Sequence, residues 1–211
     1  MKSVKIKAKT VDEAVAQALE ELDTAAENAE INVIDEGSKG LLGFIGAKDA
    51  VVEVKKIFNP VEEGKVFLKQ LLDKAKINVD VEVVQKETDD EQVLYNLMGQ
   101  KELGLVIGHR GETLDALQYL TSIYINKEVD EYYRVLLDAE GYRDRRRKTL
   151  ERLAQRLADK AEKKQRKVVL EPMPPHERRI IHITLKENNN VKSYSEGEEP
   201  YRKVMIEPLD N

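Results

Sequence analysis

The chain has 211 residues, 41% hydrophobic and 36% charged, and this length and composition favour one to three small domains over a single large core. Cysteine is absent, which excludes disulfide bonds and thiolate metal sites and suits a reducing compartment. No apolar run is long enough to span a membrane and no signal-peptide core follows Met1, so the sequence predicts a cytoplasmic protein.

The net charge of −5 is distributed unevenly along the chain. Residues 1–58 hold 8 basic and 11 acidic side chains, residues 59–140 hold 9 and 17, and residues 141–211 hold 18 and 12. The last third therefore carries a net +6 on an acidic protein. Such a local field steers polyanions, although a solvated charged helix is the simpler explanation.

The first segment reads as a β-α-β-β unit. Residues 2–9 alternate between apolar side chains and lysines, which predicts a strand. Thr10 and Glu13 have capping-box spacing, and an apolar stripe over residues 14–22 predicts a helix. Two further strands are predicted at residues 31–35 and 50–57. The unit ends near Asn59-Pro60, so we expect a domain at residues 1–58.

A glycine-punctuated turn lies between the last two of these strands. It contains four apolar side chains, Leu41, Leu42, Phe44 and Ile45. We expect this turn either to pack on its own core or to dock on another surface. It lacks the G-x-x-x-x-G-K-[ST] pattern of a phosphate loop.

Residues 59–140 predict an α-β-β-α-α-β order. The predicted helices cover residues 61–75, 101–107 and 112–126, and the predicted strands cover residues 77–83, 93–97 and 132–138. Thr88-Asp89-Asp90 is the expected hairpin turn. We expect five apolar side chains of the last helix to face inward, namely Leu114, Leu117, Leu120, Ile123 and Tyr124.

Residues 141–211 form the third expected domain, which Gly141 opens. A long basic helix is predicted over residues 143–167, followed by a short strand over 168–170. Pro172, Pro174 and Pro175 precede a second helix, with Glu177 in its first turn, where an acid suits the helix dipole. Two strands, 191–195 and 201–206, are expected to pair across Glu196-Gly197-Glu198.

The segment Ile107-Gly108-His109-Arg110-Gly111 lies between two of the predicted helices. Glycines without a Cβ let a phosphodiester backbone approach main-chain N–H groups, and the following helix N-terminus adds donors. His109 and Arg110 can reach phosphate oxygens, and we expect Leu105, Ile107, Leu114 and Leu117 to line a groove for unstacked bases. The alternative is a plain turn between two helices.

With this loop in an α-β-β-α-α-β context, residues 61–140 resemble a type II KH domain. That resemblance implies a loop that clamps about four nucleotides of single-stranded RNA or DNA. The net charge of −8 on this segment implies that its acidic side chains lie away from the groove.

A second candidate site lies on the helix after the prolines. Arg178 and His182 are four residues apart and so share one helical face, and Arg179 lies in the same broad arc. With Pro174-Pro175-His176-Glu177 before them and Ser195-Glu196-Gly197-Glu198 after them, they resemble an R-three-H domain. That family binds single-stranded nucleic acid. The alternative is a surface arginine in a salt bridge and a satisfied core histidine.

The order of these three segments resembles the Jag family of bacteria, also called the SpoIIIJ-associated or KhpB proteins. The resemblance covers essentially the whole chain. It implies a cytoplasmic RNA-binding protein linked to cell elongation and division or to sporulation, whose partner is a small single-KH protein (KhpA-like) or a second copy. The long charged linker that some members carry after the first domain is missing here.

Two other functional classes remain open from the residues alone. His176, His182, Glu177 and Glu171 could act as acid-base or metal groups of a nucleic-acid-processing enzyme, but no H-x-H, H-E-x-x-H or paired-Asp motif supports this. A protein-interaction adaptor, at the membrane insertase or the division machinery, could use the basic helix as a coiled coil. Lys160 and Lys164 interrupt its apolar seam after about two heptads.

The sequence therefore predicts an α+β protein of three small domains, at residues 1–58, 59–140 and 141–211. Its expected function is non-catalytic binding of single-stranded RNA, or of single-stranded DNA, without cofactor or metal. The predicted nucleic-acid-binding residues are Ile107, Gly108, His109, Arg110, Gly111, Arg178, Arg179 and His182.

Overall fold

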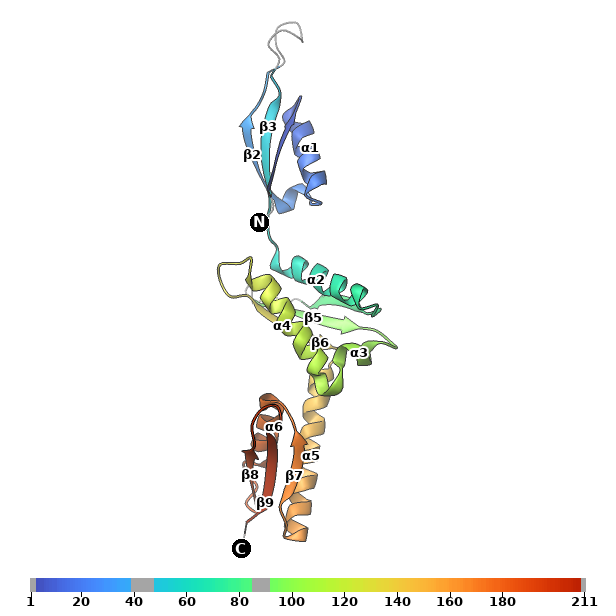
Figure 1. Ribbon diagram of the computed structural model, residues 1–211, viewed down its shortest axis with the longest axis vertical. Helices are drawn as coiled ribbons and strands as arrows, with labels where there is room; N and C mark the ends of the chain where they lie inside the picture. Colours follow the sequence, from blue (N-terminus) through green and yellow to red (C-terminus); the bar gives the residue numbers. More distant parts are fainter. Residues whose placement is uncertain (1–2, 39–47, 85–91, 210–211) are drawn as a thin grey trace. The chain divides into compact units, whose positions relative to one another are not determined.

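A computed structural model of the chain describes residues 3–38, 48–84 and 92–209 (Figure 1). The chain divides into two compact units, one formed by residues 1–103 with 115–137 and the other by residues 104–114 with 138–211. Three separate three-stranded sheets, each accompanied by helices, confirm the predicted α+β class. The predicted boundaries at residues 58/59 and 140/141 stay predictions.

The N-terminal sheet has the strand order β1-β3-β2, with all neighbours antiparallel. Its elements are β1 (Ser3–Ala8), α1 (Val11–Glu21), η1 (Ala26–Asn28), β2 (Ala29–Asp35) and β3 (Ala50–Lys56). Helix α1 lies along the sheet and buries Ala14 and Ala18 against Val52 and Val54 (Figure 1). The Thr10 hydroxyl accepts the Glu13 N–H at 3.2 Å, which caps α1 as its sequence predicts. The predicted β-α-β-β order is confirmed.

Two predicted turns lie outside the described residues. One is the apolar turn with Leu41, Leu42, Phe44 and Ile45, and the other is the Thr88-Asp89-Asp90 turn.

The second sheet has the strand order β4-β5-β6. Its elements are α2 (Pro60–Lys74), β4 (Asp80–Val84), β5 (Gln92–Met98), α3 (Leu103–Ile107), η2 (His109–Gly111), α4 (Glu112–Asn126) and β6 (Arg134–Ala139). The Asn59 side chain caps α2, with Pro60 at the first helical position, where its missing N–H costs nothing. Phe67 of α2 stacks on Tyr124 of α4 with ring centroids 4.4 Å apart. The predicted α-β-β-α-α-β order is confirmed.

The buried face of α4 differs from the predicted one. Leu120 and Ile123 are 45% and 50% exposed, and Tyr124 is also exposed. The buried positions of this helix are Leu114, Leu117, Thr121 and Ile125. This set follows the 3-4-4 spacing of a helical face, with Thr121 made acceptable by its hydroxyl donating to the Leu117 carbonyl at 2.8 Å. The prediction is confirmed for Leu114 and Leu117 and wrong for Leu120, Ile123 and Tyr124, because apolar residues occupy both sides of α4 and their pattern does not select one side.

The third sheet has the order β7-β9-β8, again antiparallel. Its elements are α5 (Tyr142–Lys164), β7 (Val168–Pro172), α6 (Pro175–Leu185), β8 (Val191–Glu196) and β9 (Lys203–Pro208). Helices α5 and α6 pack on each other and on the sheet, and small residues of α5, including Ala154 and Ala158, allow close approach to Ile181 and Ile206 (Figure 1). In the described part of the chain, no helix is both long and apolar enough to cross a membrane.

Gly64 lies in the middle of α2, where a Cβ would collide with the Tyr95 hydroxyl and come within 2.6 Å of Ile125 Cδ1. That hydroxyl donates to the Val61 carbonyl at 2.8 Å, and burial raises the pKa of Tyr95 above its ordinary value. We expect Gly64→Ala to lower the free energy of unfolding by about 1–3 kcal/mol, measured by urea denaturation.

Gly104→Ala is the matched control, because a Cβ on Gly104 of α3 would have no atom within 4 Å. This variant should be neutral, or more stable by up to about 1 kcal/mol through helix propensity. Equal stabilities of the two variants would contradict the tight packing at Gly64.

Candidate functional site

The loop between α3 and α4 has a backbone that requires its two glycines. Gly108 adopts φ 70° and ψ −168°, a region open essentially to glycine alone. A Cβ there would overlap the Thr113 side chain, and one on Gly111, at φ +91°, would lie 3.0 Å from Tyr142 Cε1. Arg110 between them is left-handed, at φ 57°. The chain therefore turns sharply here, with Thr113 and Tyr142 packed where these β-carbons would lie and Gly111 itself buried.

The loop ends where α4 begins. The Gly108 N–H donates to the Gly104 carbonyl at 2.9 Å, which closes α3. The first turn of α4 then supplies main-chain donors and the positive end of a helix dipole. The exposed His109 ring has Nδ1 3.6 Å from Glu112 Oε1. Together these features form a small surface suited to an anion.

The apolar neighbours of the loop divide into two kinds. Leu105 is exposed and Ile107 is half-buried, so both are accessible beside the loop. Leu114 and Leu117 are buried core residues. The expectation that these two line a groove is wrong, because the face of α4 that carries them points into the protein interior.

Arg110 makes the longest-range polar contacts of the loop. One guanidinium N–H, on Nη1, donates to the Pro172 carbonyl at 2.9 Å, and Nη2 pairs with the Glu171 carboxylate. All of these residues belong to the second unit. Arg110 thus contacts the end of β7. The segment that begins there, residues 172–175, contains three prolines and is called the proline segment below.

Arg178 and His182 lie one turn apart on α6, as their spacing predicts. Arg178 is only 9% exposed, with Nε donating to the Met173 carbonyl at 3.1 Å and Nη2 paired with Glu199. The half-buried His182 ring lies 2.9 Å from Ser193 Oγ and 2.8 Å from Ser195 Oγ. His182 therefore joins α6 to β8. Arg178 joins α6 to Met173 and to the turn that follows β8.

Arg179 differs from its neighbour. Its side chain is exposed, whereas Arg178 is buried, so the two arginines leave α6 on different sides. Of the three residues predicted on this helix, Arg179 is the one open to solvent, and the structure brings only Arg178 and His182 together.

An important structural residue that the sequence pattern did not reveal is Glu177. It is 1% exposed, and its two carboxylate oxygens accept bonds from Arg146 Nε at 2.6 Å and Nη2 at 3.0 Å. An acid in the first turn of a helix reads as a surface group that suits the dipole. Nothing in the basic α5 pattern distinguishes Arg146 from its exposed neighbours.

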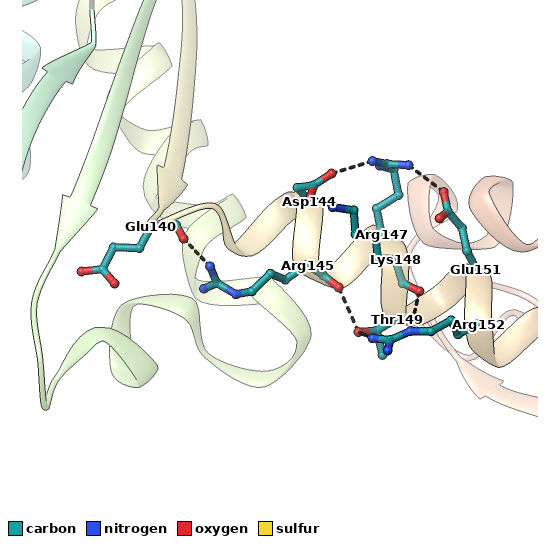
Figure 2. Close-up of polar contacts among 8 residues, drawn as sticks. All are labelled: Glu140, Asp144, Arg145, Arg147, Lys148, Thr149, Glu151 and Arg152. Carbon is teal, nitrogen blue, oxygen red and sulfur yellow. Dashed lines mark hydrogen bonds and ion pairs between the residues drawn. The ribbon is translucent and has the colours of Figure 1, made fainter.

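The N-terminal half of α5 carries exposed cations on more than one side of the helix, with Arg147 and Arg145 pointing away from each other (Figure 2). Arg147 bridges Asp144 at 2.5 Å and Glu151 at 2.7 Å, and Lys148 also reaches Asp144, at 2.8 Å. Arg145 donates instead to the Glu140 carbonyl. The exposed cations of this helix continue with Arg152, Arg156 and Lys160. The first half of α5 contains only two acids, Asp144 and Glu151, so its net charge is positive.

Comparison with known proteins matches a family model to each part of the chain. The Jag N-terminus model matches residues 6–56, the KH domain model of KhpA/KhpB matches residues 65–137, and the R-three-H domain model matches residues 148–208. KH and R-three-H domains are binding domains without catalytic activity. The fold and the matched domains thus define a non-catalytic, multidomain binding protein.

Several curated relatives are similar to this chain in sequence. An RNA-binding protein KhpB from Clostridium symbiosum is 45% identical over 98% of this chain and 91% of its own length. The protein of that name from Bacillus subtilis (strain 168) is 39% identical over 98% of each chain. A third, from Streptococcus pneumoniae, is 31% identical over 62% of this chain and 40% of its own. The chain belongs to the KhpB family.

The environment of His182 predicts a pH dependence of stability. Burial, together with the charge of Arg178, lowers the pKa of His182 below its ordinary value of 6.5. The folded chain binds a proton at this ring less readily than the unfolded chain does. The stability contributed by the neutral ring is therefore present above pH 6.5 and lost as the pH falls toward the folded-state pKa.

We expect His182→Gln to show a smaller loss of unfolding free energy than the parent between about pH 8 and pH 5.5, measured by urea denaturation. His109→Gln, at the exposed loop histidine, is the control and should retain the parent's pH dependence. Parallel curves for the parent and His182→Gln would contradict this assignment.

Proposed function

We propose that this protein binds single-stranded nucleic acid, chiefly RNA, through the loop Ile107-Gly108-His109-Arg110-Gly111 and the α6 residues Arg178, Arg179 and His182. The observation that carries the proposal is the glycine-dependent turn of the loop, which brings the exposed His109 ring and the Arg110 guanidinium beside a helix N-terminus. The relatives named RNA-binding protein KhpB support RNA as the ligand.

Each loop residue has a distinct role in this proposal. Gly108 and Gly111 give the loop the sharp turn that presents it to a sugar-phosphate backbone, and Ile107 supplies apolar contact beside them. His109 donates from its exposed ring. Arg110 forks onto a phosphate, which replaces the Glu171 carboxylate as its partner.

The α6 residues act in a similar way. Arg179 is already exposed and pairs with phosphate directly. Arg178 and His182 bind by exchanging their present partners, Glu199 and the two serines, for a phosphate or a base. This exchange explains how residues with satisfied hydrogen bonds contribute to a binding site.

The charge distribution requires the two sites to cooperate. Residues 59–140 carry a net −8 and residues 141–211 a net +6. The exposed cations of α5 therefore supply much of the attraction for the strand (Figure 2). One strand held at both sites gains affinity through effective concentration.

We also propose a cytoplasmic location, a role in cell elongation and division or in sporulation, and a protein partner. These follow from the family resemblance. The exposed apolar residues of α4, Tyr119, Leu120 and Ile123, support a partner such as a small KH protein (KhpA-like) or a second copy.

Replacing His109 and Arg110 together with aspartate tests the loop. Aspartate tolerates the left-handed backbone of Arg110, so the fold should persist. The loss of one charge-assisted hydrogen bond, worth about 1.5–3 kcal/mol, should weaken binding of a labelled single-stranded RNA at least tenfold. The slope of log K against log salt should also become shallower by about 0.7 for each phosphate that the variant no longer neutralises. Fluorescence anisotropy measures both quantities.

Lys5→Asp with Lys7→Asp is the control, because it changes the charge at least as much on an exposed strand of the N-terminal sheet. This variant should bind RNA nearly as well as the parent. Equal losses of affinity in the two double variants would mean that net charge, and not the loop, determines binding.

Glu171→Gln tests whether phosphate and carboxylate compete for Arg110. Removal of the competitor should raise RNA affinity about 1.5- to fivefold, the range expected of a partly exposed ion pair. The gain should vanish when Arg110 is replaced by glutamine, because no competition then remains. Glu187→Gln makes the same charge change on an exposed acid elsewhere in this unit. If its gain equals that of Glu171→Gln, the competition is refuted.

A further inference from the structure

A groove of about 630 Å³ adjoins the glycine loop within the second unit. Loop residues form one side of it, and the proline segment and the β8–β9 turn form the rest. Its principal lining residues are His109, Arg110, Met173, Pro174, Pro200 and Tyr201. We propose that this groove is a nucleotide subsite in which one unstacked base stacks on Tyr201 while the loop holds the neighbouring phosphate. This inference rests on the proposed function.

Tyr201 has the properties of a stacking platform. It is 76% exposed, although it lines the groove, so its ring is available to a ligand. Its N–H donates to the Glu198 carbonyl at 2.8 Å, and the next carbonyl, of Arg202, accepts the Met173 N–H at 3.3 Å. The turn is therefore tied to the proline segment. A tyrosine on a fixed backbone can stack with little loss of conformational freedom.

The charges around the groove permit a nucleotide to enter. Three carboxylates line it: Glu171 is paired with Arg110, Glu199 is paired with Arg178, and Glu112 lies 3.6 Å from the His109 ring. In the free protein the two arginines neutralise Glu171 and Glu199, and a phosphate that enters exchanges with Glu171 for Arg110. A carboxylate can also accept a hydrogen bond from an amino group on a base edge.

The groove is continuous with the loop, because His109 and Arg110 belong to both. Its volume lies within the range of about 300–1,000 Å³ typical of small-ligand sites. Proteins that recognise single-stranded RNA combine backbone clamping with aromatic stacking of splayed bases. A strand clamped at Gly108–Gly111 would place its next base beside the Tyr201 ring.

The chain contains no tryptophan, so Tyr201→Trp introduces a single tryptophan at the proposed platform, and its emission can be excited apart from that of the tyrosines. We expect an unlabelled single-stranded RNA dodecamer of mixed sequence to quench its emission, because an indole ring stacks on a base as a phenol ring does. Tyr132→Trp is the control, since Tyr132 is similarly exposed at 71% but does not line the groove. Its emission should not change when the same RNA binds.

Affinity measurements complete the test. Tyr201→Ala should weaken binding of a fluorescein-labelled dodecamer at least fivefold, and Tyr201→Phe, which keeps the ring, should bind like the parent. If the parent binds RNA through its loop while Tyr201→Trp is not quenched and Tyr201→Ala binds normally, the subsite is refuted and the proposed function stands. If the aspartate loop variant binds RNA as well as the parent, the proposed function itself fails.

Discussion

The C-terminal fold depends on one buried ion pair, between Arg146 of α5 and Glu177 of α6. A carboxylate that is 1% exposed is tolerated only because both of its oxygens accept bonds from a guanidinium. Removing one partner of such a pair generally costs about 3–5 kcal/mol, because a buried charge is left alone. This pair locks the first turn of α6 onto α5.

The position of α6 in turn determines the rest of the site. Glu177 donates its N–H to the Pro174 carbonyl at 3.1 Å, so the pair sets where Met173 and Pro174 lie against the groove. The next residue, Arg178, reaches back to the Met173 carbonyl and across to Glu199, which orients the turn that carries Tyr201. The Arg146–Glu177 ion pair thus positions the site residues. Its own two charges pair with each other and take no part in the proposed binding.

The sequence predicts the elements well and their long-range partners poorly. Predicted and observed bounds of α4 agree, because Gly111 before it and the apolar period within it are local signals. Its buried face was mispredicted, since Leu120 and Ile123 match the helical period as well as Thr121 does. Arg110 and Glu171 are 61 residues apart, so no local pattern pairs them. The burial of Arg178 also depends on the turn at Glu199, which spacing cannot reveal.

The basic side chains of the candidate site already have partners within the protein. Arg110 and Arg178 are each paired with a carboxylate, and His182 with two serines, so in the proposed function a nucleic acid would bind these side chains by exchange. A single phosphate that replaces one carboxylate gains little, because both partners carry negative charge. A strand that exchanges several partners, stacks a base and lies along the α5 cations gains from each step. The arrangement therefore favours an extended single strand over an isolated phosphate or nucleotide, even though the loop lies in the most acidic third of the sequence.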